Sequence, residues 1–397
     1  MSSFRTELVT TSEAFAGLKE PWNALVDKME CPEIFYRWEW NFHYFQNYRT
    51  HDRLFILVVW HSSGTIAAIA PFCVRNVRRL GCLARVVDTI VADMADYRNI
   101  LVHSDYHRGH VVTAVLKCLR EQTHRWDVID ISQLCSRDPT TFQIATAAHA
   151  YTDWTVRVQM SAPLVVRNLK HGRVVEDGGR LRRVRRQLQI LTKQGFHVRI
   201  GCADIAELWP AFSLLHRSAW PSSPFHSAQG RAFFDDLIRS DGMRGKIEFS
   251  SLEFHGKPVA MHFGFVDSRK VYFYMPTMDR AFRQERVGAV LLSAMVDHYA
   301  KTHEVFDFLR GAEDYKAWYT DGLDMNMRIV AHRAASFAAF AYNLPELLHR
   351  FAVELGLPKA TVQAAGRVGH DFWASARSAL VTLGKLGRRA GRRRPTA

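Results

Sequence analysis

The residues best suited to chemistry stand close together between positions 304 and 318. An apolar segment, 305–309, runs into Arg310 and Gly311, and a group of ionisable residues follows it. These are Glu313, Asp314, Tyr315 and Lys316. A buried strand that ends in glycine and leads to carboxylates, a phenol and an amine is how α/β proteins often present acid–base groups. The sequence therefore predicts an active site at the end of this strand.

The elements that must position this site come directly before it. We expect a hairpin, a third strand, a helix and a last strand, over 247–254 with 257–266, 270–276, 289–300 and 305–309. The turn falls at His255-Gly256, and Gly288 stands where the helix begins. Turn residues between β-rich runs, and helical spacing between strands, support each assignment.

The first half of the chain has the same order of elements. Its expected hairpin, third strand, helix and last strand cover 54–60 with 65–74, 98–102, 110–124 and 128–132. Because the order recurs, the sequence predicts a mixed α/β (α+β) fold with a duplicated domain, whose mixed sheets are flanked by helices. We expect an N-terminal half over 1–160, a second domain over 161–335, and C-terminal helices with a basic tail over 336–397.

The net charge of +14 is concentrated in two segments. Residues 167–199 carry ten Lys and Arg against two acidic residues, and residues 367–397 carry eight against one. In the first segment, apolar residues spaced by three or four define one face of a helix at Leu181, Val184, Leu188 and Leu191. Such basic segments favour anionic partners, namely cofactor phosphates, nucleic acid or acidic lipid.

Composition excludes several classes of protein. With 48% hydrophobic and 12% aromatic residues, a chain of 397 residues can bury large cores, so we expect a globular protein of two domains. There is no apolar run of about 18 residues and no signal peptide, so we expect no membrane-spanning helix. The six cysteines form no C-x-x-C pair and the 19 histidines show no ligand spacing. We therefore expect reduced thiols, a cytoplasmic protein and no metal.

The order of elements and several motifs resemble a known superfamily. Hairpin, third strand, glycine at a helix start and strand is the order of a GNAT acyltransferase core. The second half is similar, more specifically, to the acetyltransferase-like domain of the cellulose-biosynthesis CelD-type family, a relative of the Fem-type peptidyltransferases. The matching motifs are R-x-x-R-R at 182–186, L-H-R-x-x-W at 215–220, G-K-P-V-A at 256–260, the region of Asp279 and Phe282, G-A-V-L-L at 288–292 and D-F-L-R-G-x-E-x-Y-K-x-x-Y at 307–319. The first half resembles the family's N-terminal region more loosely, at 54–59, 69–72 and Asp96-Tyr97.

The resemblance implies acyl transfer from acetyl-CoA or another acyl-CoA to an amine or sugar-amine. In this fold the diphosphate of CoA lies against backbone N–H groups at the start of the motif helix, where the helix dipole also favours anions. The corresponding residues here are Arg283, Gln284, Arg286, Val287, Gly288 and Ala289. In the superfamily pattern Q/R-x-x-G-x-G/A, Arg283 and Gly288 fit, whereas Arg286 replaces the first glycine.

The resemblance and the residue types together assign catalytic roles. We expect Glu313 to deprotonate the attacking amine, with a surface carboxylate as the alternative. Tyr315 could protonate the leaving thiolate or pack in the core. Asp307 lies within the strand and shares a face with Leu309, opposite the phenylalanines beside it. A buried charge needs a partner, so Asp307 is either functional or ion-paired.

Further residues are expected to bind substrate, each with a structural alternative. They are His216, Trp220, Asp279, Arg310, Lys316, Arg182 and Arg186. His216 and Trp220 share a helical face and could line an acceptor cleft or pack in the core. Lys316 could instead pair with a neighbouring acid, and Asp279 could cap a turn. The two arginines could grip phosphates, contact RNA or form a solvated face.

The leading hypothesis is a cytoplasmic acyl-CoA N-acyltransferase that acts on a small-molecule or saccharide acceptor in polysaccharide or cell-envelope biosynthesis. The second half would be the catalytic copy, because the first has only Arg137 and Asp138 after its last strand. One alternative is a Fem-like transferase that uses aminoacyl-tRNA, which the basic segment 167–199 favours. Another is a non-catalytic accessory protein of a polysaccharide synthase. The basic tail could then bind acidic lipid or the synthase at the inner membrane.

Overall fold

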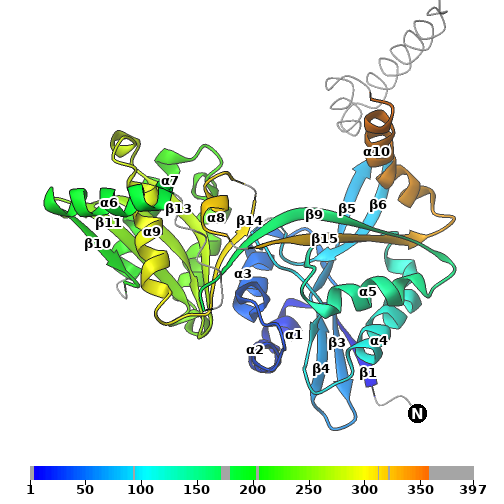
Figure 1. Cartoon of the computed structure of the whole chain (residues 1–397). Helices are drawn as coiled ribbons and strands as arrows, with labels where there is room; N and C mark the ends of the chain where they lie inside the picture. Colours follow the sequence, from blue (N-terminus) through cyan, green and yellow to red (C-terminus); the bar gives the residue numbers. More distant parts are fainter. Residues whose placement is uncertain are drawn as a thin grey trace, which may run out of the picture.

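One long sheet runs through both halves of the chain. The computed structural model describes residues 4–92, 94–170, 179–202, 205–311, 313–320 and 322–356. Its strands form an 11-stranded sheet in the order β10-β11-β12-β13-β14-β9-β15-β8-β6-β5-β2 and a 4-stranded sheet in the order β1-β3-β4-β7 (Figure 1). Helices flank both sheets, so the chain has the predicted mixed α/β fold.

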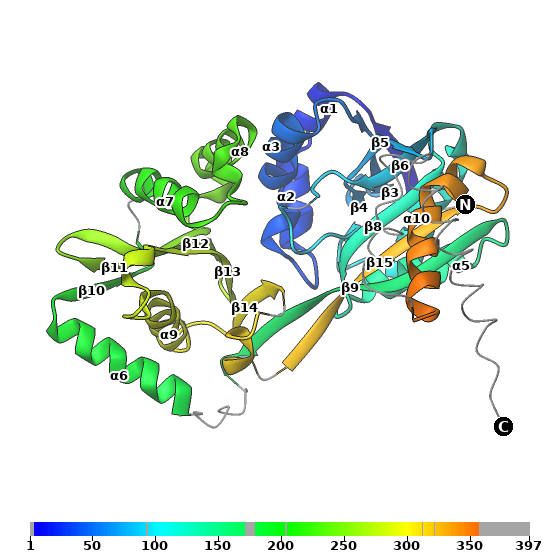
Figure 2. The same cartoon turned by 90° about the horizontal axis from the view of Figure 1, so that it is seen from above.

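The second half contains the predicted hairpin, strand, helix and strand. Its strands are β10 (Phe196–Ile200), β11 (Ile247–Phe254), β12 (Lys257–Val266), β13 (Lys270–Met278) and β14 (Val305–Arg310). Its helices are α6 (Gly179–Lys193), α7 (Ile205–Ala219), α8 (Ala228–Arg239) and α9 (Val287–Tyr299), with 3-10 turns η3 (Pro224–His226), η4 (Asp241–Met243), η5 (Arg280–Phe282) and η6 (Lys316–Trp318). Helices α7 and α8 cover one face of these strands, and α6 and α9 cover the other (Figure 2).

The apolar face predicted for the basic segment is confirmed in α6. Leu181, Val184 and Leu191 are buried and Leu188 is partly buried, all in the core that α6 shares with α9. The arginines between them stay at the surface because a helix that buries one stripe leaves the other positions to solvent.

The first half holds the same kinds of element but divides its hairpin between two sheets. Its strands are β1 (Phe4–Val9), β2 (Arg53–Leu54), β3 (Ile56–His61), β4 (Ile66–Ala70), β5 (Phe72–Arg79), β6 (Cys82–Thr89), β7 (Leu101–Val102), β8 (Val128–Cys135) and β9 (Trp154–Asn168). Its helices are α1 (Ser12–Ala16), α2 (Lys19–Asp27), α3 (Trp38–Tyr48), α4 (Arg108–Glu121) and α5 (Pro139–His149), with 3-10 turns η1 (Ile34–Tyr36) and η2 (Thr123–Arg125).

The strand expected over 65–74 breaks at Pro71, which has no N–H to continue the ladder. Strand β6 was not predicted; it follows β5 through Leu80 and Gly81, both at positive φ as in a tight hairpin turn.

Two long strands tie the halves together. β9 pairs with β14 of the second half, and β15 (Gly322–Arg333) returns from the second half to pair with β9 and with β8. Both figures of the whole chain show this ribbon between the halves (Figures 1 and 2). The boundary predicted after residue 160 falls inside β9. Strand β9, which pairs with β14 of the second half, therefore crosses that boundary. Strand β15, which pairs with β8 of the first half, lies beyond it.

Helix α10 (Phe337–Glu354) follows β15 and packs against β5 and β6. It confirms the helix expected after residue 335, whereas the basic tail over 367–397 lies outside the described residues. Within the described part of the chain, no helix is long and apolar enough to cross a lipid bilayer.

An aromatic core joins α3 of the first half to the second half. Trp40 is fully buried and contacts Phe233 and Phe265, with ring centroids 5.6 and 5.1 Å apart. Edge-to-face contacts of this kind contribute about 0.5–1.5 kcal/mol each beyond the burial of apolar area. The contact surface between the halves is therefore a true hydrophobic core rather than a loose junction.

Candidate functional site

Strands β13 and β14 are parallel and separate partway along their length. They pair only at Lys270 with Val305, Val271 with Phe306 and Tyr272 with Asp307. Beyond these pairs β13 continues to Met278 and β14 to Arg310. Beyond these pairs the facing edges of the two strands are not joined to each other by the strand ladder, so the strands diverge toward their carboxyl ends.

A bulge in β14 lies where this strand separates from β13. The register between β14 and β9 shifts between Asp307 and Arg310, and Leu309 adopts a left-handed φ of 62°. Such a conformation costs a non-glycine residue about 1–3 kcal/mol and is commonly found beside functional sites. The Asp307 carboxylate supports the bulge, because its Oδ1 accepts the Leu309 N–H at 2.8 Å.

Asp307 is the centre of a buried charge network between the halves. It is fully buried, its Oδ2 accepts the Tyr97 hydroxyl at 2.7 Å, and Lys270 Nζ lies 3.7 Å away. Lys270 also donates to both oxygens of Glu33, at 2.7 and 2.8 Å, beside a cavity of about 560 Å³. This is the ion-paired placement that the sequence left as one of two alternatives for Asp307.

The start of α9 has the features of an anion site. Arg286 adopts φ 58° and ψ 34°, a left-handed conformation that glycine adopts most readily, so the turn forms with an arginine at this position. Val290 N–H bonds to the Arg286 carbonyl, which leaves the amides of Val287, Gly288 and Ala289 at the open first turn. A side chain at Gly288 would press on Met278, since a Cβ there would lie 3.3 Å from its sulfur.

Charges around this turn favour an anion by a small margin. Arg283, Gln284 and Arg286 are exposed. The two positive charges of the arginines outnumber the single negative charge of the Glu285 carboxylate. The buried Oε2 of Glu285 has no hydrogen-bond partner among the described residues, so a donor from a ligand could satisfy it. The amides and cations thus fit a diphosphate, with Glu285 as an opposing group.

The ionisable residues that follow β14 contact one another and the end of that strand. Lys316 is buried, and its Nζ donates to the Arg310 carbonyl at 2.7 Å and pairs with Glu313 Oε2 at 2.9 Å. The Glu313 side chain is 55% exposed, and it lies so close to Gly311 that a Cβ there would be 2.5 Å from Oε2. Burial, followed by the nearby Glu313 charge, raises the pKa of Tyr315, so this phenol keeps its proton and can act as a donor.

Asp96 is a candidate that sequence reasoning did not single out for chemistry. It comes from the first half, is 7% exposed, and pairs with the Arg310 guanidinium at 2.5 Å. Burial raises its pKa from 3.8 to about 6 in spite of Arg310. A carboxyl group with this pKa is mostly ionised at neutral pH and is still basic enough to accept a proton. The only sequence signal was the resemblance at Asp96-Tyr97.

The loop that carries Asp96 lies against both separated strands. Tyr274 of β13 donates its hydroxyl proton to the Met94 carbonyl at 2.7 Å, while Asp96 and Tyr97 reach Arg310 and Asp307 of β14. Asn326 of β15 holds the loop by donating to the Asp96 carbonyl at 2.8 Å. The first half therefore forms one wall of the site beside β13 and β14.

Of the residues expected to bind substrate, His216 and Trp220 lie at the end of α7 and Asp279 follows β13. Trp220 is 46% exposed and donates from its indole to the Pro276 carbonyl of β13 at 3.1 Å. His216 is buried against Ser223, and burial lowers its pKa to about 4, so it is neutral at pH 7. Asp279 accepts the Ala281 N–H and caps η5. Trp220 is thus the member of this group that still offers a surface to a ligand.

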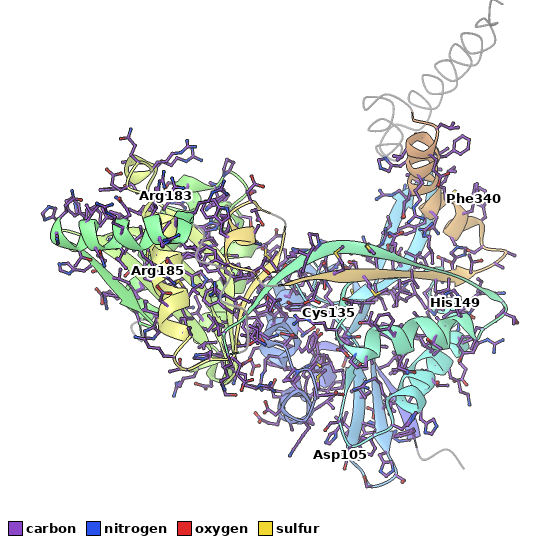
Figure 3. The ribbon with its side chains drawn as sticks, viewed as in Figure 1. Asp105, Cys135, His149, Arg183, Arg185 and Phe340 are labelled. Carbon is purple, nitrogen blue, oxygen red and sulfur yellow. The ribbon has the colours of Figure 1, made fainter. Side chains whose placement is uncertain are left out.

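The arginines of α6 lie away from the start of α9. Arg185 pairs with Asp297, ten residues after Val287, which corresponds to about 15 Å along the helix. Arg182 and Arg186 are exposed on the same helix, whose arginine-bearing face is seen at Arg183 and Arg185 in Figure 3. The structure does not bring these arginines together with the amides of α9.

Histidines and acids provide no clear metal centre in the described residues. No group of three or more His, Cys, Asp or Glu side chains is arranged to hold an ion there. His262 is buried, with its Nδ1 2.5 Å from Glu248 and its Nε2 accepting the Tyr274 N–H at 3.1 Å. Both ring nitrogens of His262 therefore have partners inside the protein.

Comparisons with known proteins bear on the fold of the chain. A family model described as an acetyltransferase (GNAT) domain matches residues 178–317. No curated protein sequence is significantly similar to the chain. The fold therefore rests on the family match and on solved structures.

Three solved structures have a similar fold. FemX is 10% identical, with a TM-score of 0.53 over 82% of this chain and 96% of its own. L-PGS from Bacillus licheniformis is 11% identical, with a TM-score of 0.51 over 81% of this chain and 94% of its own. A C-terminal domain from Agrobacterium fabrum, assigned to a lysylphosphatidylglycerol synthetase, is 12% identical, with a TM-score of 0.52 over 84% and 97%. At these identities the likeness concerns the fold alone, which is of the GNAT type.

Proposed function

We propose that this chain is an acyl-CoA-dependent N-acyltransferase whose acceptor is an amine or sugar-amine. The observation that carries the proposal is the separation of β13 from β14, with the open first turn of α9 at the carboxyl end of β13. An extended thioester donor suits such a site, because its diphosphate can meet the amides while its acyl end reaches between the strands. A role for the product in polysaccharide or cell-envelope biosynthesis follows from the CelD-type resemblance.

The donor would be held by Arg283, Gln284 and Arg286 and by the amides of Val287 to Ala289. In the reaction the amine nitrogen attacks the thioester carbonyl carbon, the new C–N bond forms and the C–S bond breaks. A carboxylate takes the amine proton, and the thiolate takes a proton from Tyr315. Glu313 is one candidate base and Asp96 the other, since Asp96 is buried beside β14 and its pKa is raised to about 6.

Turnover of a CoA thioester tests this proposal. Purified protein is incubated with acetyl-CoA and glucosamine, and released thiol is measured together with the N-acetylated product. Glu313→Gln, Asp96→Asn and Tyr315→Phe should each lower kcat by about 10²–10⁴-fold if the group transfers a proton. Asp314→Asn is the matched control, because Asp314 is an exposed acid next to Glu313 and should leave turnover unchanged.

Two results would count against parts of the proposal. Turnover that persists in all three variants would remove these residues from the mechanism. Absence of acetyl-CoA binding by calorimetry at millimolar concentrations would favour the accessory-protein alternative, in which the fold supports a polysaccharide synthase.

A Fem-like transferase that uses aminoacyl-tRNA is a second candidate. It is favoured by the FemX-like fold and by the exposed arginines of α6, among them Arg182 and Arg186. RNA binding through these side chains should weaken steeply as salt rises, because phosphate contacts release counterions. Binding of a tRNA that does not change between 50 and 200 mM salt, or that survives charge reversal of both arginines, would exclude this candidate.

A further inference from the structure

Helix α10 turns its apolar side to solvent. Seven apolar residues recur at helical spacing and share one side of the helix, about 100° wide. They form the α10 stripe: Phe337, Phe340, Leu344, Leu347, Leu348, Phe351 and Leu355. Phe337 is 71% exposed and Phe340 is 51% exposed. Within the described residues, no member of the stripe belongs to a hydrophobic core.

The opposite side of α10 is polar and holds the helix on the sheet. Tyr342 donates its hydroxyl proton to Asp130 of β8. Glu346 accepts hydrogen bonds from Arg328 of β15 at 3.0 Å and from Arg157 of β9 at 3.1 Å. A surface helix usually buries its apolar stripe and leaves its polar side chains to water. α10 has the reverse orientation, so the stripe does not serve to pack the helix on the sheet.

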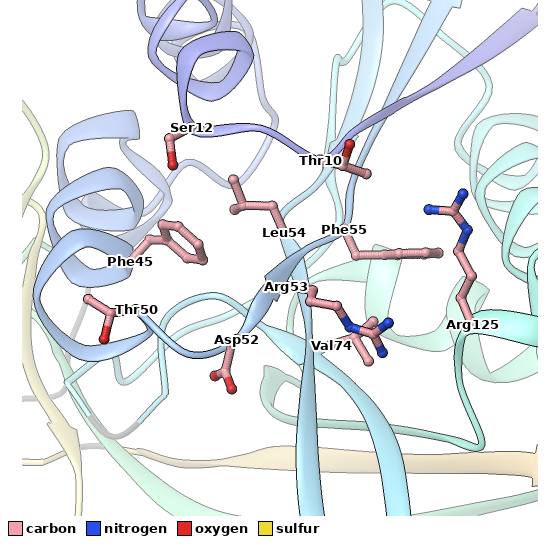
Figure 4. A pocket seen from close by; sticks show the side chains of 10 residues that line it. All are labelled: Thr10, Ser12, Phe45, Thr50, Asp52, Arg53, Leu54, Phe55, Val74 and Arg125. Atoms are coloured by element: carbon pink, nitrogen blue, oxygen red, sulfur yellow. The ribbon is translucent and has the colours of Figure 1, made fainter.

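Apolar side chains at a cavity of the first half are recessed by comparison. Phe45, Leu54 and Phe55 line a cavity of about 400 Å³, together with hydroxyl and charged side chains (Figure 4). All three are buried. The α10 stripe projects instead, because α10 lies beside β5 and β6 on the side of the first half that is remote from the second half, with Phe340 at the rim of the molecule (Figures 1 and 3). A projecting apolar side suits an extended partner, whereas a recessed cavity suits a small ligand.

The segment of chain that follows the stripe is strongly basic. Residues 357–397 carry nine Lys and Arg against one acid, Asp371. On α10 itself, Glu346 is engaged with two arginines, and Glu354 is the other acid of the helix. Cations therefore far outnumber acids along the chain from the stripe to residue 397.

We propose that the α10 stripe is a docking surface for an anionic lipid bilayer. A helix with phenylalanine and leucine on one side lies in the plane of the membrane interface, with that side about 5–10 Å deep at the boundary of headgroups and acyl chains. α10 has 18 residues and is about 27 Å long, so the whole stripe can enter one interface. Burial of the stripe and attraction of the basic segment to acidic headgroups act together, as stable attachment requires.

Charge favours a bilayer over a second copy of this chain as the partner. A second copy would bring nine more Lys and Arg to the contact, and like charges brought together oppose association. An anionic membrane complements both the apolar stripe and the cations that follow it. Dimerisation, and coverage of the stripe by residues 357–397, are separate outcomes of the test.

Sedimentation with lipid vesicles tests the proposal. The full chain is mixed with vesicles of phosphatidylcholine, with or without phosphatidylglycerol, and the bound fraction is measured against lipid concentration. Wild type should bind the anionic vesicles and not the neutral ones. Phe340→Glu should weaken this binding about tenfold or more, because it removes a buried aromatic ring and adds a charge that the headgroups repel.

Phe142→Glu is the matched control for Phe340→Glu. Phe142 of α5 is also 51% exposed and lies outside the stripe, so its replacement should leave vesicle binding unchanged. A third variant, in which Arg392, Arg393 and Arg394 are changed to Gln, should weaken binding to anionic vesicles about tenfold to a hundredfold. Urea denaturation should give the same midpoint for Phe340→Glu as for wild type, because the side chain is exposed.

Four results would overturn the proposal. They are no binding to anionic vesicles, binding that Phe340→Glu leaves unchanged, equal losses in Phe340→Glu and Phe142→Glu, and a urea midpoint that falls in Phe340→Glu alone. The last would show that another part of the chain covers the stripe. A dimer in analytical ultracentrifugation that Phe340→Glu dissociates, without vesicle binding, would assign the stripe to a second copy. No acyl donor is present in these experiments, so their outcome is independent of the proposed acyl transfer.

Discussion

Asp96→Asn should make the protein more stable at neutral pH. The folded state raises the pKa of Asp96 from 3.8 to about 6, a shift of about two units. Each unit corresponds to 1.36 kcal/mol, so the ionised carboxylate costs the folded state about 3 kcal/mol at pH 7.5. Asparagine has nearly the same shape and no charge, and it can still accept a hydrogen bond from Arg310.

The sign of the pH dependence follows from this shift. The free-energy cost of ionised Asp96 to the folded state is fully present above the folded-state pKa of about 6. It disappears below the unfolded-state pKa of 3.8, because Asp96 is then protonated in both the folded and the unfolded state. Wild type should therefore gain stability relative to Asp96→Asn as the pH falls from 7 to 4. Urea denaturation at pH 7.5, 5.5 and 4 measures the difference in unfolding free energy.

Asp130→Asn is the matched control with the opposite sign. Burial opposes ionisation of Asp130, but its hydrogen bonds with Arg328 outweigh it and lower the pKa. That variant should be destabilised at pH 7.5, and the loss should shrink in acid. If Asp96→Asn is instead less stable than wild type at pH 7.5, or if its difference does not vary with pH, the assignment of Asp96 as a strained, basic carboxylate is refuted.

Three further outcomes are expected. Arg286→Gly should raise the unfolding free energy by about 1 kcal/mol, because glycine adopts φ 58° without strain, while weakening acetyl-CoA binding in calorimetry through the lost charge; unchanged binding would remove Arg286 from the donor site. Lys270→Met should destabilise the protein by about 3–5 kcal/mol in urea, since Glu33 and Asp307 would stay buried without their cation; a loss under 1 kcal/mol would show that the pair is dispensable. Acyl transfer should fall as the pH drops below about 6 if Asp96 is the base, and Asp96→Asn should remove that step from the pH profile of kcat/KM.

Much of the second half could be predicted from local pattern. β11 and β12 occupy the predicted ranges, and α9 begins one residue before the glycine that marked it. These elements were recoverable because hairpin turns, alternation and helical spacing are short-range signals. The bulge at Leu309 left no such signal, since it depends on pairing with β9, whose residues lie more than a hundred positions earlier.

The first half was harder to predict for the same reason. Pro71 divides one apolar run between two sheets, and β6 was missed because its arginine and aspartate interrupt an otherwise strand-like run. The exchange of β9 and β15 between halves could not be foreseen, because strand partners are chosen by the tertiary packing of distant segments.

The amino-acid sequence alone determined the GNAT-like order of elements, the apolar face of α6 and the group of acids, phenol and amine after β14. These depend on residues within a few turns or strands of one another, so local chemistry is sufficient. Only the tertiary structure decided that Asp96 of the first half pairs with Arg310 of the second, and that arginines from α3's end, β5, β15 and the Asp96 loop surround one cavity. Such contacts join residues far apart in the chain, and the free energy that selects them comes from burial in the assembled fold.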